Sequence, residues 1–76
     1  MYRGSFTVVL GEEEIGKIEI MLREKWHAKD VMISNLPPCW KISFLTDDNK
    51  KVFRLLGIVK NYGGKVLRHW IEKVDY

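Results

Sequence analysis

The stretch that decides the fold lies in the middle of the chain, where residues 30–45 read DVMISNLPPCWKISFL. Residues 30–34 and 39–45 are short runs rich in apolar, β-branched or aromatic types, so both are predicted to be strands. Pro37 and Pro38 cannot donate ladder hydrogen bonds and mark a turn between them. In the second strand the apolar side chains share one face: Trp40, Ile42 and Phe44.

An amphipathic helix is predicted before this pair of strands. The acidic run at residues 12–14 suits the positive end of a helix dipole. Apolar residues then recur at spacings of three and four, which is typical of a helix with one buried side. That stripe comprises Ile15, Ile18, Leu22 and Trp26. The helix should end near His27.

A second amphipathic helix is predicted after the strand pair. Asp47 or Asp48 can accept hydrogen bonds from the free amides of its first turn. Gly63 and Gly64 should close it, because glycine tolerates the left-handed conformation at a helix C-terminus. The apolar stripe between these ends comprises Val52, Leu55, Leu56, Val59 and Tyr62.

The two ends of the chain supply the first and last strands of the expected sheet. Residues 5–10 alternate polar and apolar side chains, and residues 65–74 are a last strand with a mixed pattern. The order strand, helix, strand, strand, helix, strand predicts an α+β, ferredoxin-like βαββαβ fold, with two helices packed on one face of a four-stranded antiparallel sheet. We expect a single domain over residues 1–76.

In topology alone, this layout is similar to that of small regulatory modules of the ACT kind. The resemblance implies a binding or regulatory role, with ligands held at subunit interfaces near the first loop and helix. Residues 10–12, Leu-Gly-Glu, occupy that place here.

The alternation of the strands predicts two different sheet faces. The helix-covered face should carry Phe6, Val8, Leu10, Ile33, Trp40, Ile42 and Phe44. The open face should carry Ser5, Thr7, Val9, Met32, Ser34, Lys41, Ser43 and Leu45. For the last strand two phases stay open. Either Leu67 and Ile71 face inward and Arg68, Trp70 and Glu72 outward, or Val66, Trp70 and Val74 face inward and His69 and Ile71 outward.

Charge is unevenly distributed in the sequence. The net charge is +3, but residues 1–38 hold five Lys/Arg against six Asp/Glu, whereas residues 39–76 hold eight against four. The basic excess therefore belongs to the second half. It favours an anionic partner and says nothing about the fold.

Composition also bears on the compartment. The lone Cys39 cannot form an internal disulfide, no apolar run approaches the roughly 20 residues that cross a bilayer, and the start of the chain is too polar for a signal peptide. We expect a cytoplasmic protein without membrane contact. The absence of Gln, together with abundant Lys and Glu, follows the trend of proteins from thermophiles.

Several functions of this layout do not fit the residues present. A soft-metal carrier would need two cysteines after the first strand, and an acylphosphatase-like site would need a glycine-rich loop ending in arginine. The sequence there is Leu10-Gly11-Glu12. RNA recognition of the RRM kind needs exposed aromatics on the first and third strands. Phe6, Trp40 and Phe44 should instead point into the core.

The titratable residues suggest no active site. His27 and His69 are the only imidazoles, and their spacing joins them neither to each other nor to Cys39 as a metal set. Cys39 with His69 lacks a third orienting group. We expect no enzymatic activity, no metal and no cofactor.

Two binding hypotheses remain. The first is a small non-enzymatic binding or regulatory module that forms a homodimer through the open sheet or its edge strands, with Thr7, Val9, Ile20, Met32 and Leu45 as candidate self-association residues. The alternative is a nucleic-acid-binding protein that uses the basic outer side of the second helix, with Lys50, Arg54 and Lys60 as contacts.

Overall fold

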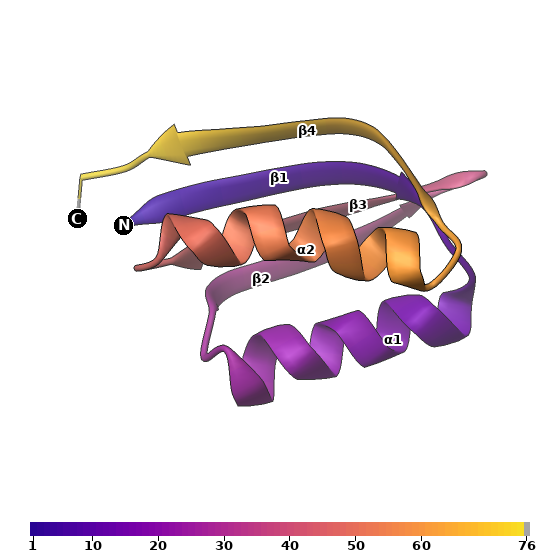
Figure 1. The fold of residues 1–76 in the computed structure, drawn as a ribbon, viewed down its shortest axis with the longest axis horizontal. Helices are drawn as coiled ribbons and strands as arrows, with labels where there is room; N and C mark the ends of the chain where they lie inside the picture. Colours follow the sequence, from indigo (N-terminus) through magenta and orange to yellow (C-terminus); the bar gives the residue numbers. More distant parts are fainter. Residues whose placement is uncertain (76) are drawn as a thin grey trace.

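The computed structural model describes residues 1–75 as a four-stranded antiparallel sheet with both helices on one side of it (Figure 1). The elements in chain order are β1 Tyr2–Val9, α1 Glu12–Ile20, a turn of π-helix Met21–Lys25, β2 Lys29–Leu36, β3 Cys39–Thr46, α2 Asn49–Asn61 and β4 Lys65–Lys73. The strands lie in the order β2-β3-β1-β4, and each neighbouring pair is antiparallel. This arrangement confirms the predicted ferredoxin-like α+β fold.

The helix-covered face of the sheet holds the hydrophobic core. Phe6 on β1 and Phe44 on β3 are almost fully buried, and their rings stack with centroids 6.2 Å apart. Trp26 meets Phe44 edge-on at a centroid distance of 6.4 Å. The helices add Ile15, Ile18, Leu22, Val52, Leu55 and Val59 to the core. The predicted covered face and the first helical stripe are therefore confirmed, and so is the second stripe except at Tyr62, which caps the helix and is 42% exposed.

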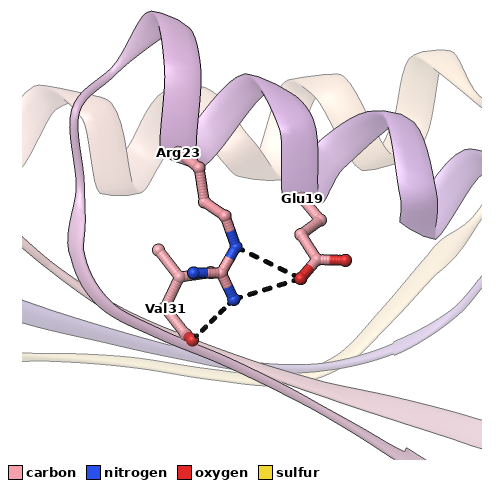
Figure 2. A network of polar contacts seen from close by, with 3 residues as sticks. All are labelled: Glu19, Arg23 and Val31. Atoms are coloured by element: carbon pink, nitrogen blue, oxygen red, sulfur yellow. Dashed lines mark hydrogen bonds and ion pairs between the residues drawn. The ribbon is translucent and has the colours of Figure 1, made fainter.

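The first helix does not end as a regular α-helix. The Trp26 N–H donates to the Met21 carbonyl, five residues back, at 2.9 Å, which widens the last turn. Figure 2 shows how this turn is tied to the sheet: Arg23 bonds the Glu19 carboxylate through Nε at 3.2 Å and the Val31 carbonyl of β2 through its terminal nitrogen at 3.2 Å. The helix therefore reaches β2 through a side-chain contact that spacing alone does not predict.

The second helix has a defined start and end. The Asp48 carboxylate accepts a hydrogen bond from the Lys50 N–H at 2.9 Å, so Asp48 and not Asp47 is the cap. At the other end Gly63 adopts a left-handed φ of 79°, and the Gly64 N–H donates to the Val59 carbonyl at 3.0 Å. The predicted boundaries of this helix are confirmed.

Both edge strands contain a bulge. On β2, Lys29 pairs with Leu45 and Met32 pairs with Ser43, so two residues of β2 oppose one of β3. Asp30 lies in this bulge with a left-handed φ of 50°, which aspartate tolerates better than most residues. The strand is consequently longer than the predicted residues 30–34.

The bulge on β4 decides which of its side chains face the core and which face outward. Thr7 pairs with Arg68 whereas Val8 pairs with Val66, so Leu67 is the extra residue. Val66 therefore faces the core before the bulge, and Ile71 is on the same side after it, opposite Gly4. Neither uniform phase holds along the whole strand. The open face receives four side chains from β4: Lys65, which pairs with Val9, and then Arg68, Trp70 and Glu72.

Candidate binding surface on the open sheet face

The open face is organised as rows of side chains that run across the sheet, because directly paired residues of an antiparallel ladder point to the same side. Three rows can be read from the register, each in the order β2, β3, β1, β4. The cationic row is Ser34, Lys41, Thr7 and Arg68. The Trp70 row is Met32, Ser43, Ser5 and Trp70. The Arg3 row is Lys29, Leu45, Arg3 and Glu72.

Positive charge predominates in these rows. They hold four cationic side chains, Arg3, Lys29, Lys41 and Arg68, against one carboxylate, Glu72. Glu72 is paired with Arg3 in the ladder and so offsets charge at one end of β4. The cationic row and the Trp70 row contain no acidic residue, so their part of the face attracts anions.

The middle of the open face is hollowed. A shallow depression of about 320 Å³ lies against Ser5, Thr7, Leu36, Lys41, Arg68 and Trp70. A second depression of about 220 Å³ includes Arg3, Met32 and Ser34, and shares Ser5 and Lys41 with the first. Short hydroxyl side chains line the floor of both. The two depressions form one broad surface of mixed polar and apolar character between Trp70 on β4 and Met32 on β2.

Trp70 and Met32 stand at the two ends of their row. Each is 60% exposed, although both are large apolar side chains. Three strand spacings of about 4.8 Å separate them, so they lie roughly 14 Å apart across the sheet. Between them lie Ser43 and Ser5, which are too short to interrupt a flat ligand.

The predicted self-association residues do not all meet on this face. Thr7, Val9 and Met32 do point outward here, and Val9 is 37% exposed. Leu45 belongs to the open face by register but is only 3% exposed, between Arg3 and Lys29 on the neighbouring strands. Ile20 lies on α1, on the opposite side of the sheet.

The basic residues of α2 lie on the other side of the molecule from the open face (Figure 1). Lys50 and Arg54 are exposed and project on one line along the helix, since they are four residues apart. Lys60 is exposed as well but is rotated from that line by about a quarter turn. The three cations therefore do not form one row.

The other reactive residues remain separate. Cys39 is half-buried at the start of β3, whereas His69 pairs with Phe6 on the helix side of β4, and His27 follows the π-helical turn. In residues 1–75, no three His, Cys, Asp or Glu side chains gather closely enough to hold a metal ion. None of the helices in that range is both long and apolar enough to cross a membrane.

An apolar strip runs along the free edge of β4. Leu67 is 58% exposed and Ile71 is 37% exposed. Phe53 on α2 is also a large apolar side chain that is 55% exposed. The opposite flank of α2 faces α1, because Lys51 on that flank donates to the Trp26 carbonyl at 3.4 Å. Phe53 lies about 200° around α2 from Lys51, so it is on the flank of α2 that faces away from α1.

A scan against protein-family models finds no match for this chain, and a search of curated proteins finds none either.

The sequence alone does not assign Arg68 and Trp70 to the open face. One of the two predicted phases of the last strand places both residues on the open face. Alternation does not decide between the phases, because two apolar residues, Val66 and Leu67, stand side by side. Such a doublet at the start of a strand is compatible with a bulge that resets the alternation. That doublet is the signal that a sequence analysis can use.

Proposed function

We propose that this protein is a small non-enzymatic binding module that works as a homodimer, in which two copies join through the free edges of β4. The observation that carries the proposal is the edge itself. Its nine residues pair with β1 on one side only, and apolar side chains are exposed along it. An unpaired strand with exposed apolar residues favours pairing with another strand.

The sequence of β4 favours one register for a symmetric antiparallel pair. With the two-fold axis at Trp70, each Arg68 stands opposite Glu72 of the partner copy, so two opposite-charge pairs flank the centre. On the helix side His69 then stands opposite the partner's Ile71. Phe53, on the flank of α2 that faces away from α1, is a further exposed apolar side chain.

Other modes of self-association are less favoured. Two open faces packed together would bring Arg3, Lys41 and Arg68 of one copy against the same cations of the other, and like charges at close range repel. The β2 edge carries Lys29 and a bulge at Asp30, two features that protect an edge from pairing. The β4 edge also carries lysines and a bulge, but Lys65 and Leu67 lie near its start and Lys73 at its end, so residues 68–72 between them remain available for pairing.

Sedimentation equilibrium at micromolar concentration tests the proposal. We expect a dimer for the natural chain and a monomer for Arg68→Glu, because that change places two carboxylates opposite each other at both ends of the centre. Glu72→Arg should also give a monomer, through opposed cations. The double variant Arg68→Glu/Glu72→Arg should restore the dimer, since it exchanges the partners in each pair.

A monomeric natural chain would overturn the proposal. So would a dimer that both single variants leave intact. Leu36→Ser on β2 is the matched control, since Leu36 is 54% exposed on the other edge strand, and it should not change the mass.

A further inference from the structure

We infer that the open sheet face binds single-stranded nucleic acid, with a base stacked on Trp70 and the backbone phosphates held along the cationic row. This site is different from the basic side of α2, but it shares Arg68 and Trp70 with the proposed dimer contact, so variants of Lys41 and Glu72 are used to separate the two proposals. The inference rests on three features that coincide on one surface: an excess of positive charge, an exposed aromatic ring, and a flat hydroxyl-bearing floor.

The charge of this surface suits a phosphate backbone. Lys41 and Arg68 are both exposed in the cationic row, on either side of Thr7. Two strand spacings of about 4.8 Å separate their backbone positions, so the two cations can contact successive phosphates. Arg3 extends the positive surface along β1. Cationic side chains that neutralise phosphates release counterions, which makes this term strongly dependent on salt.

Trp70 supplies the aromatic platform. Its ring is 60% exposed at the border of the larger depression. Trp70 and Arg68 lie two residues apart on the same face of β4, about 6.8 Å along the strand. A nucleotide whose base stacks on Trp70 therefore has its phosphate close to Arg68 or Lys41. Stacking on an aromatic side chain tolerates any base, since every base has a π-face.

The floor between Trp70 and Met32 accepts flat groups. Ser5 and Ser43 occupy the middle of that row, and Thr7 and Ser34 occupy the neighbouring row. Hydroxyl groups donate and accept hydrogen bonds, so they can pair with base edges. The width of four strands is the width on which sheet-type RNA-binding modules hold two or three bases.

These features favour a single strand over other anionic partners. A duplex hides its bases in a stack, so Trp70 would have no exposed base to contact, and nothing projects from this face to enter a groove. An acidic peptide would use the cations but would not need an aromatic ring beside a shallow floor that carries hydroxyl groups. The stacking ring comes from the edge strand β4, because β1 and β3 have no aromatic residue in the outward rows.

Fluorescence anisotropy with labelled oligonucleotides tests the inference. The probes are an oligouridine RNA, an oligothymidine DNA and a self-complementary DNA duplex of the same length. At low salt we expect both single strands to bind more tightly than the duplex. The slope of log K against log salt should fall by about 0.7 for each cation removed in Lys41→Ser and Arg68→Ser.

Variants of Trp70 separate stacking from attraction by charge. Trp70→Ala should weaken oligouridine binding by at least about fivefold, whereas Trp70→Phe should retain most of the affinity because phenylalanine still offers a ring. Polyglutamate is the probe for charge alone, and its affinity should not depend on Trp70. The matched control is Lys50→Ser/Arg54→Ser on α2, which removes two exposed cations elsewhere and should leave the affinity nearly unchanged.

Three outcomes would overturn the inference. One is the absence of binding to any oligonucleotide at low salt, and another is a preference for the duplex. The third is that Lys50→Ser/Arg54→Ser on α2 loses binding while Lys41→Ser and Trp70→Ala keep it.

The test can be kept apart from the test of the dimer. Glu72→Arg should give a monomer that still binds the oligonucleotide, because the open face only gains positive charge. Lys41→Ser lies on the central strand β3 and should remain a dimer while binding weakens. Each proposal can therefore fail while the other holds.

Discussion

The two faces of the sheet are built from alternate residues of the same strands, yet one face forms the core and the other forms an exposed surface. On β3, Ile42 and Phe44 are completely buried under the helices, while Lys41 and Ser43 between them point to the open side. On β1, Phe6 and Ser5 show the same contrast. Because neighbouring residues serve opposite faces, the fold and the surface chemistry are encoded separately along each strand, and one can change without the other.

The largest contrast between the faces is expected at adjacent positions of β3. Phe44→Ala removes a fully buried ring that contacts Phe6 and Trp26, and should lower the free energy of unfolding by about 3–5 kcal/mol. Ser43→Ala, one residue away on the open face, should change it by no more than about 0.5 kcal/mol. Urea denaturation measures both. Similar losses for the two variants would contradict the separation of the faces.

Where Phe44→Ala is too unstable to measure, Phe44→Leu provides a graded version. It keeps most of the apolar volume and should give an intermediate loss.

Substitution of two glycines by alanine tests how closely the helices pack against the sheet. A Cβ on Gly4 of β1 would lie 3.1 Å from Val52 Cγ1 and 3.3 Å from Phe44 Cζ. Overpacking of this kind costs about 1–3 kcal/mol, more than the roughly 0.5–1 kcal/mol that alanine gains over glycine inside a strand. Gly4→Ala should therefore destabilise the protein. Thermal denaturation measures this loss.

Gly57 provides the opposite case. It lies on the exposed side of α2, and a Cβ there would meet no atom within 4 Å. Gly57→Ala should stabilise the protein by about 0.5–1 kcal/mol, because alanine loses less entropy in a helix. If Gly4→Ala raised the midpoint as Gly57→Ala does, the close approach of α2 to β1 would be refuted.

A smaller effect is expected from the cap that positions α2 over the sheet. Asp48→Ala removes the acceptor of the Lys50 N–H and should cost about 1 kcal/mol. Asp47→Ala is the matched control, because Asp47 is exposed next to it and does not cap the helix. Its effect should be smaller than that of Asp48→Ala in the same denaturation experiment, and equal effects would reassign the cap.

The covered face could be predicted from the sequence because burial leaves a periodic signal. The stripe from Ile15 to Trp26 and the alternation around Ile42 each indicate one buried side, and the sheet topology follows from the order of the elements. What the periodicity did not reveal were the two bulges, at Asp30 and Leu67. A bulge depends on how a strand pairs with its neighbour, which a single strand sequence does not contain.

The open face was harder to predict for the same physical reason. Thr7, Lys41 and Ser43 were placed correctly, since their strands alternate regularly up to the ends. Trp70 depended on the phase of β4, and that phase changes at Leu67. The burial of Leu45 on the nominally open side was also not predicted, because alternation assigns a side chain to a face but does not say how far its neighbours cover it. Contacts between strands therefore decide the features of the binding surface that alternation does not.

The smallest expected effect concerns the repulsion between cations on the open face. Lys41 and Arg68 are two strand spacings apart, roughly 10 Å, which is close to the Debye length of about 10 Å at 0.1 M salt. Their repulsion should be felt at low salt and largely screened at physiological salt. Lys41→Ser should therefore raise the free energy of unfolding by a few tenths of a kcal/mol at low salt, seen as a slightly higher melting temperature. At high salt it should change almost nothing. Lys41→Arg keeps the charge and should behave like the natural chain at both concentrations.

A stabilisation by Lys41→Ser that persists at high salt would point to a cause other than charge. It would contradict the view that the cations on this face lower stability and are there because they bind an anion.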